Sequence, residues 1–190
     1  NSGVNPRYTT EYQGVLINNS TKYNLTQEML TPDVEVNKNK VVIYHTHTCE
    51  SYTPTEANPY VASGNFRTID LNYSVSRVGD ELAKNIVIDL HRDAIADETD
   101  APKVKIGDEY VSQLMFVIGS DGANSAHTNW LQNLKFAVKV QQKANELYPG
   151  LFKPIIFRNS EYNQHVAKAA CIIEVGATGN TLEESMGAMK

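Results

Sequence analysis

Short apolar runs recur along this chain, separated by stretches whose apolar residues follow a helical spacing. Short runs rich in β-branched and aromatic side chains are typical of buried strands. They predict strands over residues 41–44, 86–90, 111–119, 154–157 and 170–175. Helical spacing predicts helices over residues 26–30, 70–84 and 128–147, and a capping box from Thr181 to Glu184 predicts another near the C-terminal end.

Strands and helices alternate after residue 41, and this order is typical of βαβ units. It predicts an α/β fold, a single domain whose mainly parallel or mixed sheet is flanked by helices. A chain of 190 residues is long enough for one such domain. The first forty residues are polar and irregular, so we predict an N-terminal arm over residues 1–40 and a catalytic domain over residues 41–190.

One junction in this pattern is physically awkward. The predicted helix that ends near Leu82 continues through Ala83-Lys84-Asn85 into a strand without a Gly, a Pro or a loop. Connections from a helix to a strand usually take about 2–6 residues. We therefore expect that a segment is missing from this sequence near residues 84–85. Normal spacing of about 3.8 Å between consecutive Cα atoms there would contradict this expectation.

Composition and charge exclude several classes of function. The net charge is −5, and the Lys and Arg residues are scattered, so no basic stripe predicts nucleic acid or an anionic bilayer as a partner. The chain has no apolar run of 18 residues and no signal peptide at its start, so we expect no membrane anchor within it. Two cysteines without a CxxC pair indicate neither a disulfide framework nor a zinc ribbon.

The first candidate for chemistry is the motif His45-Thr46-His47-Thr48-Cys49-Glu50, directly after the strand over residues 41–44. Open α/β sheets keep their ligand sites at the carboxyl ends of strands. In extended backbone His45 and His47 share a face, and a tight turn would bring Glu50 to the same place. Imidazole and carboxylate groups are zinc ligands. Cys49 is a further ligand, a nucleophile or a small residue in the wall of the site. The alternative for the whole motif is a run of polar surface residues that follows a strand.

His91 lies at the end of the strand predicted over residues 86–90, just as His45 and His47 follow the strand predicted over residues 41–44. A parallel sheet brings the carboxyl ends of its strands to one edge, so these histidines can converge. Strand alternation places Asp89, His91 and Asp93 on one side, where a carboxylate could orient the imidazole. The alternative is a structural ion pair between Asp89 and Arg92.

Glu174 lies within the last apolar strand. Burial of a carboxylate costs on the order of several kcal/mol unless the group is paired, bound to a metal or neutralised. Burial near zinc would suit a general base, whereas capping a helix or pairing with an Arg would be a structural role. His165 follows Tyr162-Asn163-Gln164 just before this strand and could line the same edge, while His127 is expected to be a surface or cap residue.

Taken together, four motifs in this order resemble the stage II sporulation protein P family. They are His45–Tyr52, Ile88–Ala94, Tyr162–His165, and Ile173–Gly176 with Gly179–Glu184. The resemblance implies a zinc N-acetylmuramoyl-L-alanine amidase with a phosphorylase/hydrolase-like α/β fold. Such an enzyme acts on peptidoglycan during engulfment in endospore-forming bacteria, beside stage II sporulation proteins D and M. It would lie outside the cytoplasm at the septum or engulfing membrane, anchored to the membrane in its full-length form.

The resemblance also assigns roles to residues. Glu174 matches the catalytic glutamate and His91 a histidine ligand of zinc. Related amidases place the first histidine a few residues past the strand, which favours His47, although His45 is present in the same motif. Spacing from His47 favours Glu50 as the carboxylate ligand, with Asp70 as the alternative.

We assign substrate binding to Arg92, Asn163 and His165. The family has a longer segment between the helix ending at Leu82 and the strand ending at His91, which agrees with missing residues in this chain. The implied reaction is hydrolysis of the amide between the lactyl group of N-acetylmuramic acid and L-alanine. Two alternatives stay open: a zinc carboxypeptidase that cuts within the stem peptide, and a peptidoglycan-binding scaffold without activity.

Overall fold

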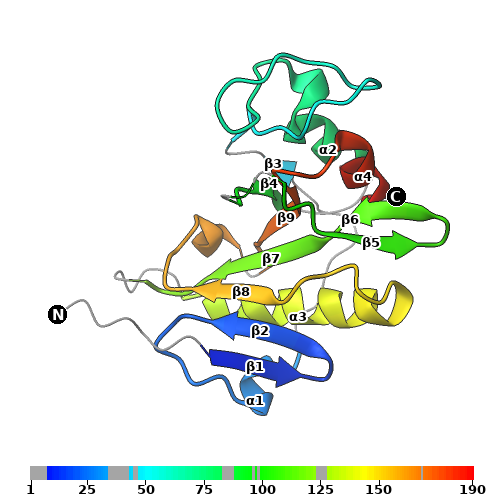
Figure 1. The fold of residues 1–190 in the computed structure, drawn as a ribbon. Coiled ribbons are helices and arrows are strands. Elements are labelled where there is room, and N and C mark those ends of the chain that lie inside the picture. The colour runs from blue at the N-terminus through cyan, green and yellow to red at the C-terminus, as the bar shows by residue number, and fades with distance from the viewer. Residues whose placement is uncertain are drawn as a thin grey trace. The chain divides into compact units, whose positions relative to one another are not determined.

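The computed structural model describes residues 8–33, 43–44, 47–82, 88–95, 97, 99–122, 128–167 and 169–190. The chain forms two compact units, each made from two separate stretches of sequence (Figure 1). The first unit combines residues 1–36 with 116–172, and the second combines residues 37–115 with 173–190. The predicted boundary near residue 40 lies close to the first change of unit, but the first unit also contains a long later stretch.

The first unit begins with a hairpin in the region where we expected an irregular arm. β1 (Tyr8–Tyr12) pairs antiparallel with β2 (Val15–Asn19) across a turn at Gly14, whose φ is 80°. β2 then pairs in parallel with β8 (Ile155–Arg158), and β8 with β7 (Leu114–Gly119). The expectation of irregular structure was therefore wrong for this hairpin. Buried positions alternate along β2 with polar or exposed ones, and this short pattern is easily mistaken for a polar loop.

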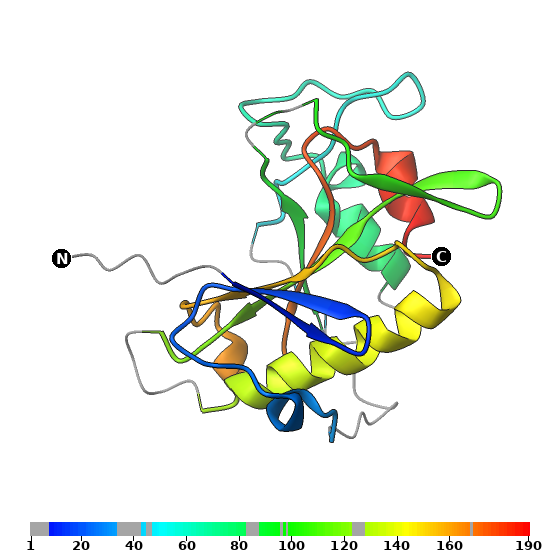
Figure 2. The same cartoon turned by 60° about the horizontal axis from the view of Figure 1, so that its bottom comes forward.

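Two helices belong to the same unit. α1 (Gln27–Leu30) is capped by Thr26, whose side chain accepts from the Met29 N–H. α3 (Trp130–Leu147) packs against α1 and β2, and Figure 2 shows it running beneath the first hairpin. Both helices were predicted, with ends that differ by no more than two residues, as is usual for helix termini. A short 3₁₀ helix, η2 (Gln164–Val166), follows β8.

The second unit contains the strands that carry the histidine motifs. β3 (Ile43–Tyr44) pairs in parallel with β4 (Ile88–Asp93), and β9 (Ile172–Ala177) is the other neighbour of β4. The first three residues of β4 are buried. The strand predicted over residues 86–90 extends three residues further, so His91 lies inside it rather than at its end.

Helices of the second unit lie beside these strands. α2 (Val75–Leu82) contacts β4 and α4 (Leu182–Gly187), and the two helices are neighbours in Figure 1. The single helix predicted over residues 70–84 is divided into η1 (Leu71–Tyr73) and α2. Ser74 separates them because its backbone is extended and bridges to Ser51. α4 begins with the predicted capping box between Thr181 and Glu184.

A second hairpin in this unit was not predicted. β5 (Lys103–Ile106) and β6 (Glu109–Ser112) pair antiparallel around Gly107, whose φ is 60°. The strand predicted over residues 111–119 is divided at Gln113, with β6 before it and β7 after it. α4 packs on β6, so this hairpin covers the helix that follows β9.

Both units combine strands with helices, and the pairs β2–β8, β8–β7 and β3–β4 are parallel. The predicted α/β class with a mainly parallel or mixed sheet is therefore confirmed. The awkward junction, including Lys84 and Asn85, lies outside the described residues, so its missing segment stays a prediction. Among the helices described, none has the length and apolar character needed to cross a lipid bilayer.

Candidate metal centre

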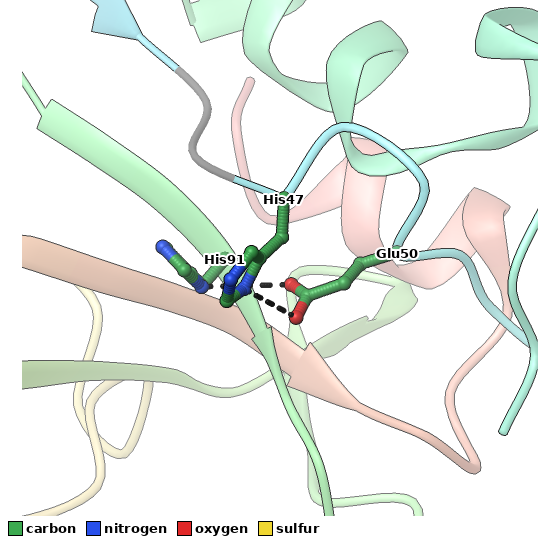
Figure 3. Close-up of side chains that lie close together, drawn as sticks. All are labelled: His47, Glu50 and His91. Atoms are coloured by element: carbon green, nitrogen blue, oxygen red, sulfur yellow. Dashed lines mark hydrogen bonds and ion pairs between the residues drawn. The ribbon is translucent and has the colours of Figure 1, made fainter. Parts of the chain in front are cut away.

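His47, Glu50 and His91 bring their potential ligand atoms within 4.8 Å of one another. His47 and Glu50 belong to the loop after β3, and His91 belongs to β4. Figure 3 shows both imidazole rings directed at the carboxylate of Glu50. The histidine motif and the second strand therefore converge as predicted, with His47, Glu50 and His91 as the three residues brought together.

Distances within this group suit a zinc ion. His47 Nδ1 lies 3.2 Å from Glu50 Oε1, and His91 Nδ1 lies 3.6 Å from Glu50 Oε2. Ligands that each lie about 2.0–2.2 Å from a tetrahedral zinc are about 3.3–3.5 Å from one another. Two imidazoles and one carboxylate form a common ligand set of catalytic zinc, with a fourth position left for water. These residues therefore fit zinc in both chemistry and spacing.

Backbone hydrogen bonds fix the loop that carries His47 and Glu50. The Glu50 N–H donates to the His47 carbonyl at 3.1 Å, which closes the tight turn expected from the H-x-x-E spacing. The carbonyl of Glu50 accepts from the Val75 N–H at 2.8 Å, at the start of α2. On the other side, the Ser51 N–H donates to the Phe66 carbonyl at 2.9 Å. The loop is thus held between α2 and the turn near residue 66.

Glu50 is the centre of the group, although it is only 5% exposed. Its Oε2 accepts from the backbone N–H of Arg92 at 3.3 Å, and its Oε1 lies 3.9 Å from Arg67 Nη2. Together with the two imidazoles, these donors and positive charges compensate for the removal of the carboxylate from water. A metal ion at this position would provide the same compensation more strongly.

His91 is held between two carboxylates. Its Nε2 lies 3.1 Å from Asp89 Oδ1, while Nδ1 faces Glu50. Burial lowers the pKa of His91, but the hydrogen bond and charge of Asp89, with the charges of Glu50 and Glu174, outweigh burial and raise the pKa. The contact with Asp89 leaves Nδ1 as the nitrogen available to a metal, an arrangement in which a second carboxylate orients the ligand. The predicted orienting role of Asp89 agrees with this geometry.

Glu174 lies on β9, the strand next to β4. Its side chain is half-buried, its Oε2 is buried, and its negative charge acts on His91. Gly176, two residues later, has a φ of 68°, and a Cβ there would lie 2.9 Å from that of Ser112. This close approach needs glycine, and it fixes the end of the strand that carries Glu174.

Arg92 is buried, and its guanidinium contacts protein acceptors. It donates to the hydroxyl of Thr178 and to the carbonyls of Asp93 and Asn65, the last two at 3.2 Å. These contacts connect β4 with the loop after β9 and with the turn near residue 65, which is a structural role. Substrate binding by Arg92 stays a prediction.

The other predicted site residues are not among the three that the structure groups. Asp70 is exposed and caps η1, since its Oδ1 accepts from the Asn72 N–H at 3.0 Å, so the structure groups Glu50 with the histidines instead. Asn163 and His165 belong to the first unit, where Asn163 precedes η2 with a φ of 57°. Their assignment to substrate binding stays a prediction. His45 lies outside the described residues, as does His127.

One residue near the centre was missed by sequence reasoning. Arg67 donates from Nη1 to Cys49 Sγ at 3.0 Å, and its Nη2 faces Glu50. Cys49 thus receives a hydrogen bond in the wall of the site, and it is not one of the three grouped residues. A single arginine in a polar loop carries no spacing signal that connects it with a motif seventeen residues earlier.

Comparisons with known proteins agree with the resemblance found in the sequence. The profile of the family "Stage II sporulation protein P" matches residues 5–86 and 84–190. Stage II sporulation protein P of Bacillus subtilis (strain 168) is 27% identical over 197 aligned residues, which cover 77% of this chain and 47% of that protein. The chain therefore spans about half the length of this curated relative. No solved structure matches the chain significantly.

The form of these matches bears on the awkward junction. Since 77% of 190 residues is about 146 residues, about 50 of the 197 aligned positions have no counterpart in this chain. The two segments of the family match meet at residues 84–86, where the sequence predicts missing residues.

Because the family profile covers nearly the whole sequence, the chain belongs to the stage II sporulation protein P family, a family of sporulation proteins.

Proposed function

We propose that this chain is the catalytic part of a zinc-dependent N-acetylmuramoyl-L-alanine amidase. The observation that carries this proposal is the group of His47, Glu50 and His91, with Glu174 on the neighbouring strand. The three grouped residues would hold zinc and leave one position for water. When bound, the ion would polarise the scissile carbonyl and make water a nucleophile near neutral pH.

The remaining steps belong to side chains of this chain. Glu174 would take the proton of the attacking water and pass it to the leaving amine. Asp89 would hold the imidazole of His91 so that Nδ1 faces the metal position. Glu50 joins the two histidines through one buried carboxylate, so loss of Glu50 would remove both a ligand and the group that positions the other two.

The substrate in this proposal is the amide between the lactyl group of N-acetylmuramic acid and L-alanine in peptidoglycan. The setting would be engulfment in a sporulating bacterium, outside the cytoplasm at the septum or engulfing membrane. Stage II sporulation proteins D and M would be partners, and the full-length protein would be anchored in the membrane. The sporulation protein from Bacillus subtilis supports the general setting through its name.

The proposal is tested by digestion of purified peptidoglycan with the zinc-loaded chain, followed by mass analysis of the products. We expect intact stem peptides that begin with L-alanine, released from the glycan. Glu174→Gln should keep about one zinc per chain and lose at least about a hundredfold in rate, because general acid–base catalysis contributes 10²–10⁴-fold. Glu109→Gln removes an exposed carboxylate on β6 and should leave the rate unchanged.

Other products would identify the alternatives. Shortened stem peptides that stay attached to the glycan would indicate a carboxypeptidase instead. Binding to peptidoglycan without zinc and without products would indicate a scaffold. A fully active Glu174→Gln enzyme would end the assignment of the general base.

A further inference from the structure

Arg67 is a cation at the exposed edge of the metal centre. Its Nη1 donates to Cys49 Sγ at 3.0 Å, and its Nη2 lies 3.9 Å from Glu50 Oε1. The side chain is 43% exposed, whereas that of Glu50 is 7% exposed. The guanidinium therefore has one side on the buried ligand group and the other side in solvent.

The backbone around Arg67 is fixed on both sides. Arg67 and Ser63 exchange two N–H···O bonds of 2.9 Å each, which closes a tight hairpin. The Thr68 N–H donates to the Cys49 carbonyl at 2.9 Å, so the same segment is joined to the loop that carries the metal ligands. This arrangement holds the guanidinium at the site before any ligand arrives, which lowers the entropic cost of using it.

Most of the donors of Arg67 are available to a ligand. A guanidinium has five N–H donors, and one hydrogen bond to sulfur uses one of them. Arg67 Nη2 lies 3.9 Å from Glu50 Oε1, which is close enough for an ion pair but too far for a hydrogen bond. Glu50 has closer partners in His47, His91 and the Arg92 N–H, so Arg67 is a minor contributor to holding it.

The charges near the site also favour a cation at its edge. Three carboxylates, those of Glu50, Asp89 and Glu174, act on His91, and a bound divalent ion would offset only two of these three negative charges. Among the described residues that contact Glu50, Arg92 is buried with its guanidinium on protein acceptors, while Arg67 faces solvent. Arg67 is thus placed to receive negative charge on an incoming molecule.

We infer that Arg67 binds a carboxylate of the substrate beside the scissile amide. This inference rests on the proposed function and adds a determinant of specificity to it. In a stem peptide, the carboxylate meant here is that of the acidic residue following L-alanine. A guanidinium binds a carboxylate through two parallel N–H···O bonds, a geometry that lysine cannot reproduce.

The test compares two preparations of peptidoglycan, one with a free carboxylate at the second stem residue and one with that carboxylate amidated. Arg67→Gln should lower the release of stem peptides from the acidic preparation by about tenfold to a hundredfold, the range expected for a hydrogen bond to a charged group. On the amidated preparation, Arg67→Gln and the unmodified chain should agree within about twofold. Arg67→Lys should lose most of the preference, mainly through a higher KM.

A second measurement does not depend on turnover. The Glu174→Gln chain should sediment with acidic peptidoglycan more tightly than with the amidated form, and addition of Arg67→Gln should remove this difference. Arg77→Gln, which removes a cation of α2 in the same unit, is the matched control and should keep the preference. Zinc content should stay the same in all variants.

The outcomes separate the two proposals. If the unmodified chain releases no stem peptides, the amidase proposal fails, and the sedimentation preference still decides whether Arg67 binds a carboxylate. If Arg67→Gln slows both preparations equally or lowers zinc content, its role is structural and the inference is wrong.

Discussion

The first unit buries the amides of Gln164 and Asn133 against backbone groups, whereas the second unit buries the carboxylates of Glu50 and Asp89 beside the partly exposed imidazole of His91. In the first unit, Gln164 accepts from the Gly119 N–H at 2.9 Å and donates to the Val117 carbonyl at 2.8 Å. Asn133 donates to the Gln164 carbonyl at 2.9 Å and accepts from the Ala170 N–H at 3.1 Å. Each side-chain amide is thus matched to backbone groups, which is how proteins usually satisfy buried polar atoms.

The second unit uses its buried polar groups in a different way. Glu50 faces two imidazoles, and His91 faces Asp89 as well, so titratable side chains mainly contact one another. Charged groups gathered in this way cost more to bury than amides and change their charge with pH. The first cluster therefore stabilises the fold, whereas the second is suited to bind a cation.

The largest effect on this comparison is expected from His91→Ala. This change removes one of the three proposed ligands and leaves Glu50 and Asp89 without the imidazole between them. We expect zinc affinity to fall by more than about a hundredfold, beyond the range seen when only the partner of a ligand is removed. Competition with a zinc-binding dye measures this affinity. His165→Ala, in the first unit, is the control, and an unchanged affinity in His91→Ala would contradict the metal centre.

The next effect is expected in the first unit. Gln164→Ala leaves the Gly119 N–H and the Val117 carbonyl without their side-chain partner, and each buried group costs about 1–3 kcal/mol. The free energy of unfolding in urea should therefore fall by about 2–4 kcal/mol, while zinc affinity stays the same. Gln142→Ala removes an exposed amide of α3 and should change stability by less than about 0.5 kcal/mol. Equal loss in both variants would remove the contrast between the units.

A smaller loss of zinc affinity is expected from a change at Asp89. Asp89→Asn keeps an acceptor beside His91 Nε2 but removes the charge that orients and polarises the imidazole. Zinc affinity should fall by about tenfold, less than for His91→Ala. The dye competition used for His91→Ala measures it, with Asp97→Asn, an exposed carboxylate, as the control. If Asp89→Asn equals His91→Ala in effect, Asp89 is itself a ligand and the proposed arrangement is wrong.

Sequence patterns predicted the elements that are long or fully buried. β9 is a mainly apolar run and α3 has a continuous helical spacing, so both were predicted to within two residues, whereas β7 was predicted as one strand with β6. The two hairpins were missed because the alternation of apolar and polar residues in their strands is short and weak. In β5, only Val104 and Ile106 alternate with exposed lysines, and such a short alternation resembles a loop.

The candidate site divides in the same way. His47 and His91 were predicted because they follow or end predicted strands whose carboxyl ends the topology brings together, and Glu50 was predicted from its spacing to His47. Spacing from His47 already favoured Glu50 over Asp70, and the turn between residues 47 and 50 and the capping of η1 by Asp70 agree with that choice. Arg67 reaches the site through backbone pairing with another loop, and no sequence period encodes such a contact.

The smallest predicted effect concerns the helix that follows the strand of Glu174. Burial raises the pKa of Glu184, but hydrogen bonds from Lys103 and Asn180 outweigh burial and lower the pKa below its usual 4.5. A lowered pKa means that the charged form stabilises the fold above the unfolded pKa, and that this stability is lost as pH falls through the folded value.

Glu184→Gln should therefore lower the free energy of unfolding by less than about 1 kcal/mol at pH 7, because part of the contact with Lys103 is exposed and screened. The difference from the unmodified chain should shrink between about pH 5 and pH 3. Urea unfolding across this range measures it, and Glu109→Gln should show no such trend. A difference that grows toward low pH would mean that Glu184 is held in its neutral form, which the capping box with Thr181 argues against, since its carboxylate accepts from the Thr181 N–H at 3.2 Å.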